Sequence, residues 1–296
     1  MIGCFMPKGR RELTGAAFPV PWLGLLHQRF PLYRRLGEAD RRELQEKILV
    51  FLAEKNFEGC GGLSITDEIR VTVAAQACLL LLHRPAKCYA GLRSILVYPS
   101  TYFAPSVRHY HGGVTSEEQI ALLGESWEHG AVVLAWDSVC GGAANPFDGH
   151  NVVLHEFAHQ LDQEDGLANG APVLGRGRPL LERIGLYSSW ARILAAEYEQ
   201  LRRKAGKGRK SVLDRYAASH PAEFFAVATE CFFEKPRQLL KKRPQLYGEL
   251  KRFYCQDPAT WTEGPPESGD EPIEPADAGR STPATDSTAA PTGSRR

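Results

Sequence analysis

The sequence predicts an α+β domain that is mostly helical and contains a small sheet of short strands. Apolar residues recur at helical spacing along most of the chain, and three short segments have the pattern of strands. Hydrophobic residues make up 43% and charged residues 24% of the 296 residues, so the chain can bury a globular core. Because the strands do not alternate regularly with helices, we do not expect a doubly wound parallel sheet.

Two helices are predicted in the first third of the chain. Asp40 is a candidate cap for one helix, and Thr66, followed by two acidic residues, is a candidate cap for a second helix that ends near His83. The second helix is apolar on most of its faces, so we expect it to be buried. The apolar positions of the first helix are Leu44, Ile48, Leu49 and Leu52.

Three short strands are predicted in the middle of the chain, at residues 94–98, 119–123 and 131–136. Pro99 ends the first of them, and the turn-forming residues 128–130 separate the other two. The segment 131–136 has two interpretations. It is either an edge strand, to which an extended peptide adds as a further strand, or a buried central strand.

Three helices are predicted in the second half of the chain. The first starts at Asp148 and continues to residue 161, the second spans residues 190–204, and the third begins at Pro221 and ends before Pro236. A glycine-rich stretch, residues 166–177, lies between the first two helices. Such a stretch either borders a binding cleft or forms a plain surface loop.

Composition also divides the chain into three parts. Residues 262–296 contain six prolines and a single large aliphatic residue, Ile273, so they cannot bury enough apolar surface to offset the entropy of ordering. We therefore predict a disordered tail at 262–296, a folded domain at 20–261 and an N-terminal extension at 1–19.

Charge and cysteine usage exclude several classes of protein. The tail carries seven acidic and three basic residues, which leaves 33 basic and 28 acidic residues in 1–261, a net charge too small to indicate nucleic acid binding. The longest apolar stretch, 73–82, is too short to cross a membrane, and no apolar run follows the first basic residues as in a secretory signal. The seven cysteines form no C-x-x-C pair, so we expect free thiols in a cytoplasmic protein.

The segment that indicates chemistry is H-E-x-x-H at residues 155–159. On a helix, His155 and His159 lie one turn apart on the same face, so both rings can bind one metal ion. Glu156 is rotated by about 100° from His155, which places its carboxylate beside the metal, where water would bind. The rest of the helix surface is apolar, with Val152, Val153, Phe157 and Leu161.

A catalytic zinc ion takes three protein ligands and keeps one position open for water. Glu223 is the leading candidate for the third ligand, because a carboxylate among phenylalanines is costly to bury unless it is paired or bound to a metal. Glu230, two turns further along the same helix, and Asp165 are the alternatives. The metzincin extension is absent, since Asp162 and Asp165 stand where its glycine and third histidine would be.

These motifs, taken in order, resemble the Mlc titration factor A family of zinc peptidases over roughly residues 20–260. The similar segments are H-E-F-A-H-Q-L-D at 155–162, D-R-Y-A-A at 214–218, P-A-E-F-F-A-V at 221–227, E-C-F-F at 230–233 and the upstream segments at 95–99, 124–127 and 132–136. The resemblance implies a zincin-like metallopeptidase domain whose catalytic core is akin to that of anthrax lethal factor.

The resemblance also implies a site and a partner. One Zn²⁺ per chain would be bound by His155, His159 and Glu223, with Glu156 as the catalytic base and Tyr216 close to the metal. Members of the family have peptidase activity, mainly aminopeptidase-like, and bind the transcriptional repressor Mlc. We therefore expect a peptide or protein substrate and a repressor of the Mlc type as a second partner, with no direct nucleic acid binding.

The predicted reaction is hydrolysis of a peptide bond by zinc-bound water, with Glu156 taking the proton and returning it to the leaving amine. Tyr216 is either the donor that stabilises the oxyanion or a packed aromatic residue. Asp162 either orients the imidazole of His159 without binding the metal itself, or caps the helix end or forms a surface salt bridge. The alternative functions are a non-catalytic zinc protein that sequesters a transcriptional regulator, and zinc-dependent hydrolysis of a non-peptide bond.

Overall fold

A computed structural model describes residues 16–84, 89–100, 102–109, 115–122, 124–127 and 130–261 of the chain. The predicted tail, 262–296, and most of the predicted N-terminal extension, 1–19, lie outside these residues, so the proposed boundaries stay a prediction. The described residues confirm the predicted fold class, because helices dominate and the strands are short and few.

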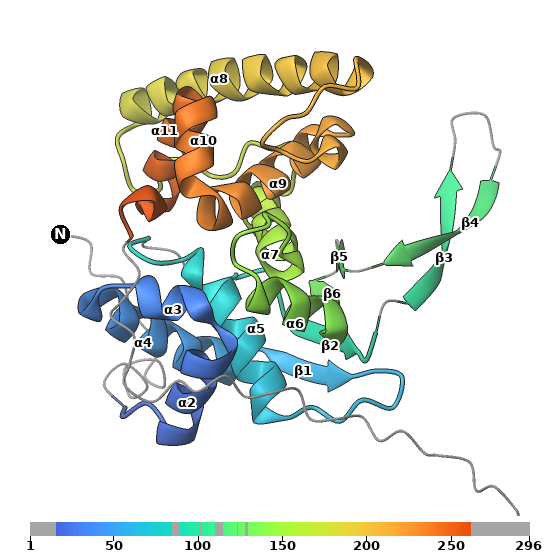
Figure 1. Cartoon of the computed structure of the whole chain (residues 1–296), viewed down its shortest axis with the longest axis vertical. Helices are drawn as coiled ribbons and strands as arrows, with labels where there is room; N and C mark the ends of the chain where they lie inside the picture. Colours follow the sequence, from blue (N-terminus) through green and yellow to red (C-terminus); the bar gives the residue numbers. More distant parts are fainter. Residues whose placement is uncertain are drawn as a thin grey trace, which may run out of the picture. The chain divides into compact units, whose positions relative to one another are not determined.

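All the described strands lie in the first half of the chain, and only helices follow them (Figure 1). The N-terminal helices are α2 (Val20–Arg29), α3 (Pro31–Arg35), α4 (Glu38–Glu54) and α5 (Asp67–Leu79), followed by α6 (Trp136–Ala144) and α7 (Val152–Asp162). The C-terminal helices are α8 (Leu180–Gly206), α9 (Pro221–Glu234), α10 (Pro236–Lys242) and α11 (Pro244–Tyr254). Three short 3₁₀ turns are η1 (Gln163–Asp165), η2 (Arg215–Ala218) and η3 (Pro258–Thr260).

Two predicted helix starts have different outcomes. Thr66 caps α5 as predicted, since its side-chain oxygen accepts a hydrogen bond from the amide of Ile69 at 3.3 Å. The predicted cap at Asp40 is wrong, because α4 begins at Glu38 after Gly37 and Asp40 lies within its first turn. An acidic residue there still stabilises the helix through the helix dipole.

The main sheet has the strand order β1-β2-β6-β5, with β1 (Asn56–Gly59), β2 (Ser94–Tyr98), β5 (Gly124–Trp127) and β6 (Ala131–Ala135). The first three strands in that order are parallel, and β5 is antiparallel to β6. The interpretation of 131–136 as an edge strand is therefore wrong. β6 is central and buried, because β2 and β5 pair with both of its edges, and Trp136 already begins α6.

The second sheet is a two-stranded antiparallel hairpin of β3 (Tyr102–His109) and β4 (Thr115–Leu122). It extends away from the helices (Figure 1). Residues 119–122 of the strand predicted at 119–123 lie in β4, and residue 123 is outside the described residues, whereas β1, β3 and β5 were not predicted. Their sequences alternate poorly or are very short, so the pairing partners rather than local pattern determine them.

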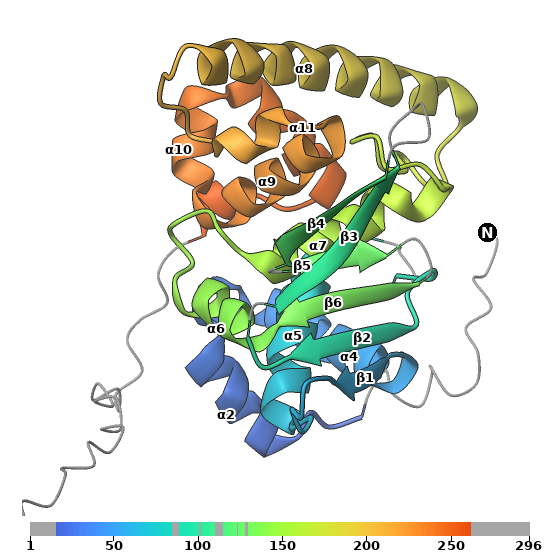
Figure 2. The same ribbon diagram turned by 90° about the vertical axis from the view of Figure 1, so that its right-hand side faces the viewer.

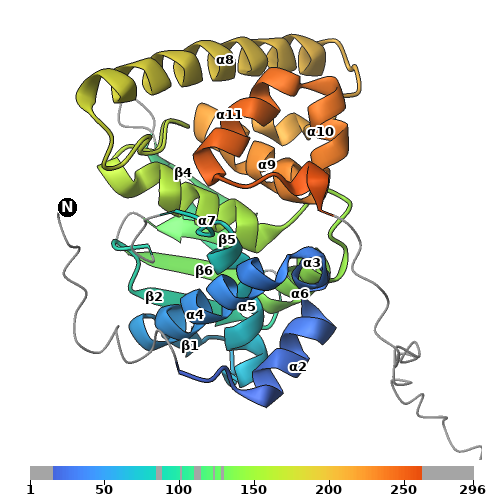
Figure 3. The ribbon, with the colours of Figure 1, turned by 90° about the vertical axis from the view of Figure 1, so that its left-hand side faces the viewer.

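Helix α7 lies between the sheet with its N-terminal helices and the C-terminal helices (Figures 1 and 2). Figure 3 views the sheet from its helix-covered face, with α4 and α5 in front of the strands. On one side of α7, the ring of Phe157 packs against Phe51 and Tyr89, with ring centroids 5.8 and 4.8 Å away. This burial, worth about 1.5–3 kcal/mol for one phenylalanine, turns the opposite side of α7 toward α9. In the part of the chain that the structure describes, no helix is long and apolar enough to cross a membrane.

Candidate metal centre

Helix α7 starts at Asn151, which the structure shows as its cap in place of the predicted Asp148. The side-chain oxygen of Asn151 accepts a hydrogen bond from the amide of Leu154 at 3.0 Å. Its side-chain nitrogen donates to Gln76 on α5 at 2.8 Å and to Glu234 on α9 at 3.0 Å. This buried network joins three helices at the start of α7 and so determines how the helix is rotated about its axis.

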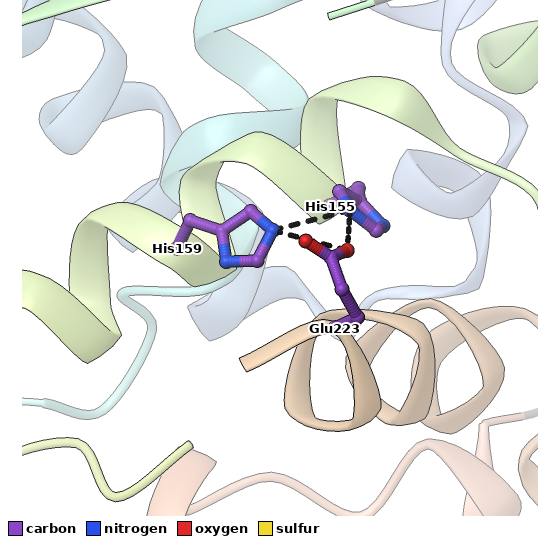
Figure 4. A group of neighbouring side chains, drawn as sticks. All are labelled: His155, His159 and Glu223. Atoms are coloured by element: carbon purple, nitrogen blue, oxygen red, sulfur yellow. Dashed lines mark hydrogen bonds and ion pairs between the residues drawn. The ribbon is translucent and has the colours of Figure 1, made fainter. Parts of the chain in front are cut away.

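Helix α9 begins as predicted, with Pro221 in its first turn. His220 is the cap, because its Nδ1 atom accepts a hydrogen bond from the amide of Ala222 at 3.2 Å. The following residues are almost all buried, and α9 packs along α7. Glu223 lies in the first turn of α9 and points at the two histidines of α7 (Figure 4).

Three side chains meet between these helices: His155, His159 and Glu223. The Oε2 atom of Glu223 lies 3.0 Å from Nε2 of His155 and 3.5 Å from Nε2 of His159, and the two Nε2 atoms are 3.2 Å apart (Figure 4). Ligand atoms about 2.0–2.1 Å from a tetrahedral zinc ion are about 3.3–3.4 Å from one another. The three side chains therefore match a zinc ion both in donor type and in spacing.

Glu230, one alternative third ligand, has a different position. Its Oε1 atom lies 2.7 Å from Nδ1 of His155, on the other side of the ring from Nε2. Its Oε2 atom accepts a hydrogen bond from the backbone amide of Asn151 at 2.5 Å. Asp165, the other alternative, is exposed in η1 and accepts from the amide of Leu167. Neither belongs to the group of converging ligand atoms.

The charges of these side chains depend strongly on one another. Burial alone would lower the pKa of His155, but its hydrogen bonds with Glu223 and Glu230 outweigh this effect and raise the pKa to about 10. Burial alone would raise the pKa of Glu223, and its hydrogen bonds with the two histidines instead bring it well below the usual range. A proton on His155 therefore competes with a metal ion for the same position.

Glu156 is the one carboxylate in the H-E-x-x-H segment, and it is 6% exposed. Burial raises the pKa of Glu156 to about 7, although both histidines act to lower it. Its carboxyl group is not among the converging ligand atoms. A carboxyl group with a pKa near neutrality can both accept and release a proton at physiological pH.

Comparison with known proteins identifies the family of the chain. The model of the glucose-regulated metallopeptidase M90 family matches residues 6–255. This chain belongs to that family. Membership in a metallopeptidase family implies a metal ion, and the three converging side chains are where the described residues fit one.

Two kinds of M90 relative have similar sequences over most of their length. An uncharacterized protein of Synechocystis sp. is 41% identical over 249 residues, which cover 84% of this chain and 88% of the relative. Mlc titration factor A of Serratia proteamaculans is 34% identical, with 75% and 84% covered, and that of Klebsiella pneumoniae strain 342 is 31% identical, with 81% and 87% covered. The predicted resemblance to the Mlc titration factor A family is thus confirmed.

Tyr216 of this M90 chain lies in η2, immediately before α9. Its ring centroid is 6.2 Å from that of His155, and the residue is 57% exposed. The turn is held by Asp214, whose carboxylate accepts a hydrogen bond from the amide of Tyr216 at 2.7 Å. The structure therefore places the ring of Tyr216 beside that of His155, one of the three converging side chains, at the surface of the protein.

Asp162, at the end of α7, makes a contact that its sequence position did not indicate. Its Oδ2 atom accepts a hydrogen bond from the amide of Gly170 at 2.8 Å, and among the described residues no hydrogen bond joins it to His159. The carbonyl of Gly170 in turn accepts from the indole of Trp190 at 2.9 Å. Asp162 interacts with His159 only through its charge, so the predicted orienting role has no hydrogen bond behind it among the described residues. Its hydrogen bond instead attaches the glycine-rich loop to the end of α7.

Proposed function

We propose that this chain is a zinc-dependent peptidase that hydrolyses peptide bonds, with water as the nucleophile and Glu156 as the general base. The observation that carries the proposal is the meeting of His155, His159 and Glu223 at zinc-ligand spacing beside the buried Glu156. The membership in a metallopeptidase family supports the same conclusion.

His155, His159 and Glu223 would hold the metal, and two imidazoles with one carboxylate leave it with a net positive charge. A zinc ion bound there would polarise the carbonyl of a substrate and lower the pKa of a water molecule. The carboxylate of Glu230 accepts a hydrogen bond from Nδ1–H of His155, which would keep the proton on Nδ1 and leave the lone pair of Nε2 free to bind the metal. Glu230 thereby fixes the orientation of the imidazole ring of His155.

Glu156 supplies the proton transfer that the reaction needs. As water attacks the carbonyl carbon, the carboxylate of Glu156 accepts a proton, and it donates that proton to the amine nitrogen as the peptide C–N bond breaks. The buried position of Glu156 is consistent with this role, since burial brings its pKa close to neutral pH. Tyr216 would donate its hydroxyl hydrogen bond to the oxyanion of the tetrahedral intermediate.

The sheet offers a place for the substrate backbone. β5 is one of the two edge strands of the described sheet, and it is the one that contacts α7, which carries the two histidines. A peptide in extended conformation can pair with such an edge, which presents backbone donors and acceptors. We propose that substrates bind along β5, with an aminopeptidase-like preference for their N-terminal end.

A second binding function is favoured by the relatives. Several proteins about one-third identical to this chain bear the name Mlc titration factor A. We propose that this chain also binds a transcriptional repressor of that type, and that it does so in the cytoplasm. The free thiols of Cys60, Cys78, Cys140, Cys231 and Cys255 are consistent with that reducing compartment.

The deciding experiment compares wild type with Glu156→Gln on a library of peptides, after the zinc content of both proteins has been measured. Gln is nearly isosteric and position 156 is not a proposed ligand, so we expect one zinc ion per chain in both. Peptide cleavage should fall by about 10² to 10⁴ in the variant, which lacks the proton acceptor. A chelator should abolish cleavage by wild type, and zinc should restore it.

Two outcomes would contradict the peptidase proposal. A zinc-loaded wild type that cleaves no peptide would make sequestration of a regulator the leading function. Equal activity in Glu156→Gln and wild type would show that the cleavage arises at another site. Binding of the repressor Mlc should be the same in both proteins, because the substitution leaves the surface unchanged.

A further inference from the structure

A cavity of about 410 Å³ lies between the segment that follows α5, the glycine-rich loop, the first part of α8 and α11. None of its lining residues is a proposed metal ligand, so it is separate from the metal centre. Its volume lies within the range of about 300–1,000 Å³ that is usual for small-molecule sites. The apolar part of its wall includes Leu174, Leu186, Trp190 and Phe253.

The polar part of this wall is strongly basic. Four arginines line it against a single carboxylate, that of Glu249. Three of the arginines already have acidic partners: Arg176 pairs with Glu164, Arg178 with Glu182, and Arg252 with Glu249. With these three charges paired, the remaining positive charge among the four arginines is that of Arg84, and a positive charge in a concave, partly apolar site raises the local concentration of anions.

The fourth arginine, Arg84, lacks such a partner. Among the described residues its side chain makes no ion pair or hydrogen bond, and its Nη1 atom is fully buried. The guanidinium lies over the ring of Phe253, with Cζ 4.0 Å from the centroid, which occupies one flat face and leaves the N–H groups at the edge. Burial lowers the pKa of Arg84, because desolvation disfavours the charged guanidinium.

We propose that this cavity binds a small organic anion whose phosphate or carboxylate group pairs with Arg84. Both groups present two oxygens at the spacing of the guanidinium fork, so both can accept two parallel hydrogen bonds. The apolar part of the ligand packs against the apolar lining residues, among them Trp190 and Leu186. A ligand bound there also contacts the loop anchor, because the indole of Trp190 donates to Gly170.

The test measures binding of two probes to the full-length, zinc-loaded protein by calorimetry and by thermal shift. Glycerol 3-phosphate represents phosphate esters and succinate represents carboxylates, and sodium chloride at equal ionic strength serves as the salt control. We expect saturable binding of at least one probe, and the tighter of the two identifies the anionic group. Affinity should fall at least about tenfold in Arg84→Gln, which removes the charge and the fork.

Two further variants keep the test decisive. Arg178→Gln changes a rim residue that is 61% exposed, so it should fold normally and still weaken binding several-fold. Arg209→Gln is the matched control, because this exposed arginine lines a different basic cavity of about 290 Å³. The proposal is wrong if neither probe binds saturably, if Arg84→Gln and Arg178→Gln both bind as wild type, or if Arg209→Gln alone loses binding.

Discussion

The Oε1 atom of Glu230 lies 2.7 Å from Nδ1 of His155, and Nε2 of the same ring faces Glu223. The two carboxylates therefore contact opposite nitrogens of a single imidazole. Since a carboxylate only accepts hydrogen bonds, Glu230 requires the proton on Nδ1 and leaves Nε2 available to a metal ion.

This relationship predicts that Glu230 positions a ligand without being one. In Glu230→Gln, we expect one zinc ion per chain to bind, as in wild type. The zinc affinity should fall about 10- to 100-fold, which is typical when a residue that hydrogen-bonds to a metal-binding histidine is lost. Competition with a chromogenic chelator measures the affinity. Glu223→Ala is the comparison and should lose far more, and the reverse order would show that Glu230 is the ligand.

Tyr216→Phe tests the oxyanion donor. We expect kcat to fall by about 10² to 10³ while KM and zinc content change little, since the hydroxyl acts on charge that develops in the transition state. The stable turn around Asp214 should keep the ring in place. Steady-state kinetics on one cleaved peptide give the answer, and unchanged kcat would leave Tyr216 as a packing residue.

Gly170→Ala tests how tightly the glycine-rich loop is attached to α9. Gly170 has φ of 76°, and an added Cβ would lie 2.5 Å from the carbonyl oxygen of Pro221, two residues before Glu223. We expect a loss of about 2–4 kcal/mol in the free energy of unfolding, from left-handed strain and the clash together. Zinc affinity should fall as well, because the start of α9 must shift.

Gly166→Ala is the matched control for that substitution. Gly166 also has a positive φ, 90°, but an added Cβ would meet no atom within 4 Å. It should cost only the backbone strain, about 1–2 kcal/mol, and leave zinc affinity unchanged. Denaturant unfolding of the zinc-loaded proteins compares the two, and equal losses would argue against contact between loop and helix.

Glu234 predicts a pH dependence of stability. Burial raises its pKa to about 8 in the folded protein, although hydrogen bonds from Asn151 and Gly149 act to lower it. Because the folded pKa lies above the unfolded value of about 4.3, stability from this group is full below pH 4 and is lost as pH rises to 8.

The measurement compares unfolding of wild type and Glu234→Gln between pH 5 and 8. Over this range the free energy of unfolding of wild type should fall, relative to the variant, by up to about 1.4 kcal/mol per pH unit, the value for one proton. Parallel pH profiles would show that Glu234 is ionised in the folded protein throughout.

The local features of this protein follow from its sequence alone. His155 and His159 lie on one face, with Glu156 beside them, because the helical period relates residues that are neighbours in the chain. The start of α9 at Pro221 and the cap at Thr66 are equally local, since they depend on fixed φ and on a single side-chain hydrogen bond. Membership of the family was also recognisable from motifs in order.

The tertiary structure decides what depends on contacts between distant segments. Glu223 and Glu230 lie on the same helix and are both plausible ligands by sequence, and only the packing of α9 on α7 places one at Nε2 and the other at Nδ1 of His155. The hydrogen bond of Asp162 to Gly170 and the central position of β6 depend on loop and strand partners that local sequence does not specify. Periodicity acts over a few residues, whereas the partner of a side chain or strand is chosen by the packing of the whole core.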